Sequence, residues 1–548
     1  MSSFFHEPQT DTLIYPGVLP GHIAPFLPDA KQINGSYFAV PRSLRNSIVL
    51  AQYNYPVMPV MDDYDWPIEP GRKALPHQKI YANFSALHPK MLNLGDPGTM
   101  KTISTLWAMD FMMRQFPPGT CRAIVIAPLS ILETVWATAI ARNFPGRRTF
   151  KVLIGDADKR RRLLAEPADV YIINPDGVKI DAHIKKRGAL KRGEKRIELR
   201  GFCAELEARK DIRIVIADEA SVYKDASTYR HEITRMVLGD RPFWWLLTGT
   251  PTPNAPSDAH GLAKLVNNAY GKSFNHFRSE SMIKVSEFKW VPQKDGYEKA
   301  RRLLTPSVRF ALDDVWDGPP MTFQRRKIDL TDAQRRHMSD LKNKLQVLTA
   351  NGKAISADNE AAARQKFIQI SLGMIYDEDH KAHPIDAGPR YSELYDIISS
   401  TQRKVVVFVV ITAAIHLMMD YVRKQWKTAK LPYKCSFING EVSGKQRGPT
   451  IKAFAEDPEM KVIFADPVAA GHGINDFVVA DTVVWASASD KAESWIQGNG
   501  RVRRPGQQYP STCYQLVSNK LEEEIFDRLE TNTGMQGVML AAIRDGKF

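Results

Sequence analysis

Cysteine is scarce in this chain of 548 residues, and no two of its four cysteines are close in the sequence. No CxxC spacing occurs, which argues against a structural zinc site, and scattered single cysteines do not form a disulfide framework. We therefore expect a reducing compartment. The four residues are Cys121, Cys203, Cys435 and Cys513.

The sequence also lacks a long apolar run, an internal repeat and a low-complexity segment. Its most apolar stretch, residues 405–419, includes Thr412 and His416 and is shorter than the roughly 20 residues that a membrane span needs. We interpret it as a buried strand that runs into a helix. The first residues, MSSFFHEPQTDTLIYPG, show no basic segment followed by an apolar one, so we expect no secretory signal and no membrane partner.

Acidic residues are outnumbered by basic ones, 61 to 75, which gives a net charge of +14. Such an excess favours a polyanionic partner, above all nucleic acid. The apolar share of 43% and the charged share of 25% are ordinary for a globular protein and give no support to a disordered or fibrous chain. At this length we expect about three to four domains of roughly 150 residues each.

Two series of short β-branched segments, separated by helical stretches, predict an α/β fold with two doubly wound parallel sheets. The first series lies in residues 75–259 and the second in residues 391–520. Residues 260–390 carry helical patterns and are expected to form a helical connector. We expect an irregular or accessory region at 1–74 and a helical tail at 521–548. The expected strands are AIVIAP, VYIINP, IRIVIADEA and FWWLLTGT in the first series and KVVVFVV, CSFING, KVIFADP and DTVVWAS in the second.

A glycine-rich segment, GDPGTMKT at residues 95–102, nearly fits the phosphate-binding pattern GxxxxGK[ST]. In such a loop, backbone N–H groups wrap the phosphates, the Lys neutralises them and the hydroxyl ligates Mg²⁺. The loop departs from the pattern at Met100, where glycine is expected. Because Met is unbranched and flexible, we expect its side chain to point into the domain interior while its N–H faces phosphate. The residues assigned to ATP are Gly95, Gly98, Thr99, Met100, Lys101 and Thr102, with Thr102 also on the metal.

An acidic pair, Asp218 and Glu219, follows the apolar run IRIVIA. This order puts both carboxylates at the C-terminal end of a buried strand, where ligands of open α/β sheets bind. Downstream of a phosphate loop, we expect Asp218 to hold Mg²⁺ and Glu219 to orient and deprotonate the attacking water.

A strongly basic segment, KKRGALKRGEKRIELR, occupies residues 185–200 with eight basic and two acidic residues. It is either a solvated loop, a basic arm on DNA or, in a nucleated cell, a localisation signal.

Further segments make the pattern specific: LPHQ ending at Gln78, PLSIL followed by Trp136, LLTGTPTPN, GHGIN and QGNGRVRRPGQ. Together with the loop and the acidic pair, and in this order, they resemble the motifs of superfamily-two helicases, specifically the Swi/Snf-type DNA translocases. The resemblance spans roughly residues 75–520. The ending RPGQ at 504–507 and the Trp after PLSIL favour this type over the DEAD-box RNA helicases. The layout resembles compact bacterial or viral members, which implies the cytoplasm of a bacterium or of an infected host cell and leaves the nucleus open.

The resemblance implies two RecA-like domains with ATP in the cleft between them. In the first domain, Gln78 is implied to read the adenine edge, and Thr248 and Thr250 to couple the site to DNA. In the second domain the implied residues are Arg501 and Arg504 as arginine fingers, with Gln497 and Gly473 completing the face that this domain presents to ATP.

Three functions follow as hypotheses. The first is an ATP-dependent, Mg²⁺-dependent translocase on double-stranded DNA, whose protein partners the sequence does not reveal. The others are a true strand-separating helicase on DNA or RNA, and a nucleic-acid-binding scaffold whose ATP site has decayed at Met100. The sequence also departs from the family at Ser221, where His is frequent. A scaffold would be free to lose the other site residues, so their joint presence favours an enzyme: Lys101, Asp218, Glu219, Arg501 and Arg504.

Overall fold

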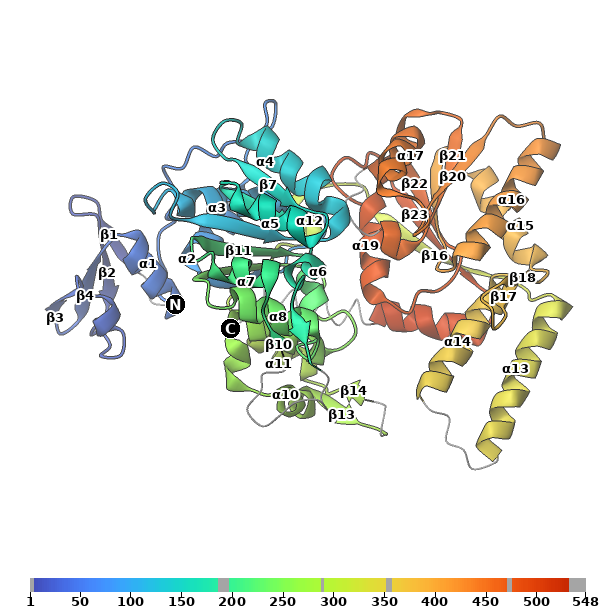
Figure 1. Cartoon of the computed structure of the whole chain (residues 1–548), viewed down its shortest axis with the longest axis horizontal. Coiled ribbons are helices and arrows are strands. Elements are labelled where there is room, and N and C mark those ends of the chain that lie inside the picture. The colour runs from blue at the N-terminus through green and yellow to red at the C-terminus, as the bar shows by residue number, and fades with distance from the viewer. Residues whose placement is uncertain (1–3, 186–196, 287–289, 351–356, 471–475, 532–548) are drawn as a thin grey trace.

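The computed structural model describes residues 4–185, 197–286, 290–350, 357–470 and 476–531. Two parallel β-sheets form two lobes, and a small antiparallel sheet lies at the N-terminal end (Figure 1). None of the described helices combines the length and apolar content that a membrane crossing needs. All four cysteines are buried with free thiols.

The sheet of the first lobe has seven parallel strands, and helices cover both of its faces. The strand β6 shows why: Ile124 and Ile126 pack on one face, whereas Ala123 and Val125 pack on the other. A strand buried on both faces reads as a continuous apolar run, which is why the sequence predicts it. The order is β15 (Ser307–Val308), β5 (Lys90–Asn93), β12 (Phe243–Leu247), β11 (Ile212–Asp218), β6 (Arg122–Ile126), β8 (Val170–Ile173) and β7 (Phe150–Leu153).

The helices of this lobe divide between the two faces. Those on the face that carries the phosphate loop are α2 (Pro76–Leu87), α3 (Lys101–Met113) and α4 (Thr138–Asn143). Those on the opposite face are α5 (Ala157–Ala165), α7 (Gly201–Ala208), α8 (Tyr229–Leu238) and α9 (Ala259–Val266).

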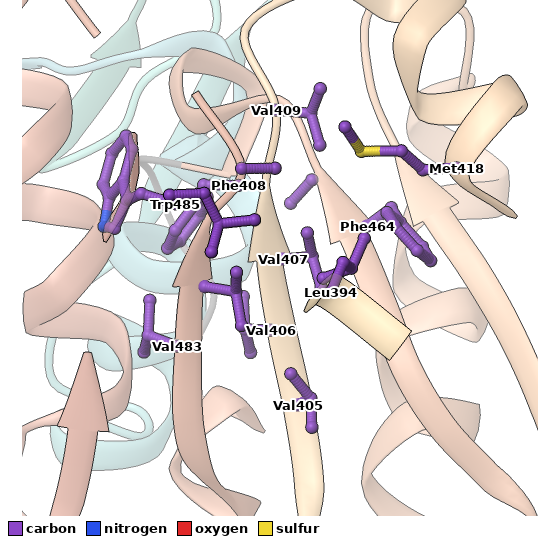
Figure 2. Close-up of a cluster of buried hydrophobic side chains, with 14 of the residues drawn as sticks. Leu394, Val405, Val406, Val407, Phe408, Val409, Met418, Phe464, Val483 and Trp485 are labelled. Atoms are coloured by element: carbon purple, nitrogen blue, oxygen red, sulfur yellow. The ribbon is translucent and has the colours of Figure 1, made fainter. Parts of the chain in front are cut away.

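The sheet of the second lobe has six parallel strands around the apolar strand β19. Figure 2 shows side chains of this strand packed with Phe464 and Val483 of its neighbouring strands and with Met418 of α16. The order is β16 (Met321–Lys327), β23 (Ser511–Val517), β22 (Ala480–Trp485), β19 (Lys404–Phe408), β21 (Met460–Ala465) and β20 (Lys434–Ile438). The principal helices are α15 (Gly388–Ser400), α16 (Thr412–Thr428), α17 (Gly444–Glu456) and α19 (Ala492–Val502), and residues 520–531 are also helical. The prediction of two doubly wound parallel sheets is confirmed.

The segment 260–390 contains several helices and also adds an edge strand to each sheet. The strand β15 pairs with β5 in the first lobe, and β16 pairs with β23 in the second. Sequence reasoning missed both because β15 has only two residues and β16 (MTFQRRK) is a polar, largely exposed edge strand. The helices here are α10 (Phe274–Ser281), α11 (Gly296–Leu303), α12 (Leu312–Val315), α13 (Asp332–Ala350) and α14 (Ala357–Ser371), with the hairpins β13 (Met282–Lys284)–β14 (Trp290–Pro292) and β17 (Met374–Tyr376)–β18 (Ala382–Pro384).

The N-terminal region is more ordered than the sequence indicates. Four antiparallel strands and α1 (Leu44–Gln52) enclose a small apolar core, so the description as irregular is wrong for these residues. The strands are short and separated by Pro- and Asp-containing turns, which hides their alternation. From Met61 onward the chain joins the core of the first lobe. The strand order is β1 (Phe5–Glu7), β2 (Thr12–Pro16), β4 (Tyr37–Pro41) and β3 (Lys31–Asn34).

Candidate nucleotide-binding and catalytic site

The phosphate loop connects β5 to the first turn of α3. Gly98 has φ +89°, and Met100, the residue before the helix, has φ +59° in the left-handed region. This backbone explains why the pattern has glycine at position 100, since a side chain there costs roughly 1–2 kcal/mol. The helix nevertheless begins at Lys101, so its free N–H groups and the positive end of its dipole face the loop.

Hydrogen bonds hold the loop in shape from within. The Nζ atom of Lys101 donates to the carbonyl oxygens of Gly95 (2.7 Å) and Asp96 (2.9 Å), and burial lowers the pKa of this lysine. The Asp96 carboxylate in turn accepts from Arg309 (2.9 Å) and from the backbone N–H of Leu312 (3.1 Å). The loop is thereby tied to the chain that leads into the second lobe.

The acidic pair lies at the end of β11. The indole Nε1 of Trp136 donates to Asp218 Oδ2 (2.9 Å), and the N–H of Glu219 donates to Asp218 Oδ1 (3.0 Å). Burial raises the pKa of both carboxyl groups, and the Asp218 charge helps raise that of Glu219 to about 7. Two buried carboxylates side by side favour a bound cation.

The helix α19 of the second lobe brings further groups to this pair. Its Gln497 donates through Nε2 to Glu219 Oε2 (3.1 Å), and its Glu493 accepts from the Ser221 hydroxyl (2.5 Å). The helix can lie this close to its own sheet because of Gly498, where a Cβ would be 3.1 Å from the rings of Phe408 and Trp485. In Figure 1, α19 lies on the side of the second lobe that faces the first.

One cleft of about 700 Å³ gathers most of the predicted site residues. Its lining comes from three segments: the phosphate loop, the end of β11 and the C-terminal part of α19 with the residues that follow. The remaining wall is formed by residues of the segment 68–73, the start of α2, residues of the segment 131–135 and α4. The predicted residues that line it are Gln78, Gly98, Met100, Lys101, Thr102, Asp218, Glu219, Arg501 and Arg504.

The expected orientation of Met100 is wrong. Its side chain is 38% exposed and lines the cleft, and its sulfur accepts a hydrogen bond from Gln78 Nε2 (3.0 Å). The reason is the left-handed backbone at this residue, which directs the side chain outward rather than into the core. Gln78 itself is buried, and its Oε1 accepts from the N–H of Leu75 (2.8 Å).

Other predicted residues lie beside the cleft rather than on its surface. The Thr99 hydroxyl donates to the Asp96 carbonyl (2.9 Å) within the loop. At Gly95, a Cβ would lie 1.9 Å from the Tyr81 hydroxyl, so no side chain fits there. Thr248 Oγ1 accepts from the Thr250 N–H (3.0 Å) in the turn after β12.

Three sequence-based predictions fall wholly or partly outside the described residues. The first is Gly473. The second is most of the basic segment, residues 186–196, whose described flanks pair as the short strands β9 (His183–Ile184) and β10 (Ile197–Glu198). The third is the expected helical tail at 521–548, of which only residues up to 531 are described. These remain predictions.

Sequence reasoning missed Glu493 and the wall formed by residues 68–73. The available signal for Glu493 was its position four residues before Gln497, which places both on one face of a helix. The linker segment 68–73 is fixed to α4, because the Glu69 N–H donates to Asn143 Oδ1 (2.8 Å) and Arg142 pairs with the Glu69 carboxylate (3.4 Å). No local sequence feature indicates that contact.

A phosphate loop and a strand-end acidic pair in one parallel lobe, met by Gln and Arg side chains of a second such lobe, define a helicase-like ATPase core. The chain belongs to the SNF2 family: the SNF2-related domain matches residues 93–377, and the helicase conserved C-terminal domain matches residues 389–506. The resemblance seen in the sequence is thereby confirmed.

Individual relatives are distant. A probable chromatin-remodeling complex ATPase chain of Oryza sativa subsp. japonica is 22% identical over 81% of this chain, which spans only 38% of that protein. Putative protein p41 of Acyrthosiphon pisum secondary endosymbiont phage 1 is 23% identical over 82% of this chain and 93% of the phage protein. Among solved structures, the Sulfolobus solfataricus SWI2/SNF2 ATPase core in complex with dsDNA aligns with 87% of this chain and 95% of that chain, at 18% identity and a TM-score of 0.39.

Proposed function

We propose that this protein is an ATP-dependent translocase on double-stranded DNA. The observation that carries the proposal is that the phosphate loop of the first lobe and the end of α19 in the second lobe line the same cleft. A nucleotide in this cleft touches both lobes. Its binding and hydrolysis therefore alter how the lobes are held together, which is the differential contact that a stepping motor needs.

The first lobe supplies the binding groups. Lys101 and the N–H groups around Gly98 bind the β- and γ-phosphates, and Gln78 contacts the adenine. Mg²⁺ fits beside Thr102 and Asp218, where buried carboxyl groups with raised pKa values favour a cation. When bound, the ion would neutralise charge on the phosphate oxygens.

Catalysis draws on both lobes. Glu219, with its pKa raised to about 7 by burial, is the base that takes a proton from the attacking water. Gln497 holds the Glu219 carboxylate through its hydrogen bond (3.1 Å). Arg501 and Arg504 line the same cleft and stabilise the charge that develops on the transferred phosphoryl group.

The DNA contact rests on charge and on the family. The net charge of +14 favours contacts with phosphates, which are poorly sequence-specific and sensitive to salt. Thr248 and Thr250 are proposed to transmit nucleotide state to DNA. In support, a Cβ added to Gly249 between them would lie 2.9 Å from Pro97 Cδ, so this turn lies directly against the phosphate loop.

ATP hydrolysis by the full chain, measured without nucleic acid and with single-stranded DNA, duplex DNA or RNA, tests the proposal. We expect Mg²⁺-dependent hydrolysis that duplex DNA accelerates most. A parallel assay with a forked duplex distinguishes a translocase from a strand-separating helicase, since release of a strand would identify a helicase. Equal hydrolysis rates under all four conditions would overturn the translocase proposal.

A further inference from the structure

The two polar ends of the Gln78 carboxamide are held by different partners. Oε1 accepts from the N–H of Leu75 (2.8 Å), and Nε2 donates to the sulfur of Met100 (3.0 Å). The opposite orientation of the amide would set its NH₂ group against the Leu75 N–H and its oxygen against the sulfur. The two contacts therefore fix which way the carboxamide faces.

This orientation leaves capacity for one more hydrogen bond at each end. A carbonyl oxygen has two lone pairs and an amide nitrogen has two N–H donors, so Gln78 can still accept once and donate once. Adenine offers a donor at N6 beside an acceptor at N7, and a glutamine side chain pairs with both. Guanine offers two acceptors, O6 and N7, and its O6 would face the Gln78 oxygen.

The sulfur orients the Gln78 amide without competing with a nucleotide base for it. A thioether is a weak acceptor and occupies one of the two N–H donors, so the other donor stays available to the base. With a backbone φ of +59°, the Met100 side chain lines the cleft and contacts Gln78. A glycine here, as the general pattern has, provides no such contact.

We propose that Met100 is a specificity-determining residue that orients the Gln78 carboxamide to select adenine over guanine. The proposal rests on the function proposed above, because it assumes that the nucleotide base lies against Gln78. It gives the departure from the phosphate-loop pattern a role in base recognition rather than in the binding of phosphate.

The test is calorimetric titration of the full chain with Mg²⁺-ATP, Mg²⁺-GTP and Mg²⁺-tripolyphosphate. For Met100→Gly we expect the ratio of ATP to GTP affinity to fall by up to about fivefold, the worth of an ordinary neutral hydrogen bond, with tripolyphosphate affinity unchanged. Met100→Leu, which keeps the bulk and removes the sulfur, should lower the ratio in the same direction. Met236→Leu on the exposed surface of α8 is the matched control and should leave it unchanged.

The outcomes separate this proposal from the one on which it rests. An unchanged affinity ratio in Met100→Gly, or an equal loss for all three ligands, overturns the role of Met100 while ATP binding by the parent protein stands. A parent protein that binds neither ATP nor tripolyphosphate overturns both proposals. Thermal unfolding of each variant shows that it is folded, and the glycine variant also relieves the backbone strain at this position.

Discussion

The two lobes have the same parallel architecture but contribute differently to the cleft. In the first lobe the site groups hold one another: Lys101 bonds to its own loop, Trp136 bonds to Asp218, and Gln78 bonds to Met100. In the second lobe, α19 presents its groups to partners in the first, as Gln497 and Glu493 do. Under the proposed function, this difference means that groups of the first lobe bind the nucleotide, whereas hydrolysis needs groups of both lobes.

The largest expected effect is that of the arginines of the second lobe. Arg501→Ala and Arg504→Ala should each slow single-turnover hydrolysis by about 10³- to 10⁵-fold, because an arginine finger acts on transition-state charge. The measurement is rapid-quench hydrolysis with enzyme in excess. Arg161→Ala on α5, which breaks an exposed pair with Glu205, is the control. A rate within tenfold of the parent would place the transition-state charge elsewhere.

The next effect concerns the base that the first lobe supplies. Glu219→Gln keeps the size of the side chain but removes the proton acceptor, so hydrolysis should fall by about 10²- to 10⁴-fold. Binding of Mg²⁺-ATP, followed by calorimetry, should remain. Glu205→Gln on the opposite face of the sheet serves as the matched variant. Parent-like turnover by Glu219→Gln would show that another group takes the proton.

A smaller effect should follow when the contact between Ser221 and Glu493 is removed. A hydrogen bond to a charged group is worth about tenfold, so Ser221→Ala and Glu493→Ala, each of which removes this contact, should each slow hydrolysis by about that factor. Because the two residues form one contact, the double variant should be no slower than either single one. Fully additive losses in this cycle would mean that the residues act independently.

The smallest expected effect on nucleotide binding comes from removing one buried carboxylate in either lobe, and both removals should lower stability. Asp110 in the first lobe accepts from Tyr64 and Arg148 (both 2.6 Å), and Glu522 in the second accepts from Arg390 (2.6 Å). Glu522→Ala should lower the free energy of unfolding by about 3–5 kcal/mol, since it leaves the buried Arg390 charge without its carboxylate. Asp110→Ala should lower it by less, since Arg147 keeps its pair with Asp65 (2.6 Å). Urea unfolding measures this loss.

Of these two changes, only Asp110→Ala should also lower the affinity for Mg²⁺-ATP. Tyr64, which donates to Asp110, lies four residues before the linker segment 68–73 that lines the cleft, so Asp110→Ala should weaken Mg²⁺-ATP affinity by about fivefold, the worth of one hydrogen bond. Glu522→Ala should leave it unchanged. If both variants bind Mg²⁺-ATP with equal affinity, the linker segment does not contribute to nucleotide binding.

Much of the fold was predictable because the inner strands are continuous apolar runs, as in IRIVIAD of β11 and KVVVF of β19. The polar edge strand β16 and the short N-terminal strands were not, because their burial depends on neighbours distant in the chain. Lys101 and Asp218 were predicted from the spacing of their motifs, and the structure brings both to one cleft.

The rest of the site was hidden for a physical reason. The direction of the Met100 side chain follows from a left-handed backbone that residue type alone does not predict. The contact of Ser221 with Glu493 joins residues 272 positions apart. Sequence patterns identify groups whose chemistry is fixed by spacing, but not contacts that arise when two lobes meet.

The division between the lobes is tested most directly by measuring Mg²⁺-ATP affinity and single-turnover hydrolysis together for Lys101→Ala and Arg501→Ala. Lys101→Ala should lose affinity, because it removes a phosphate-binding charge of the first lobe. Arg501→Ala should bind Mg²⁺-ATP nearly as the parent does and yet hydrolyse it at a small fraction of the parent rate. An Arg501→Ala protein that loses affinity as severely as Lys101→Ala, or that turns over normally, would contradict a site in which one lobe binds and the other completes catalysis.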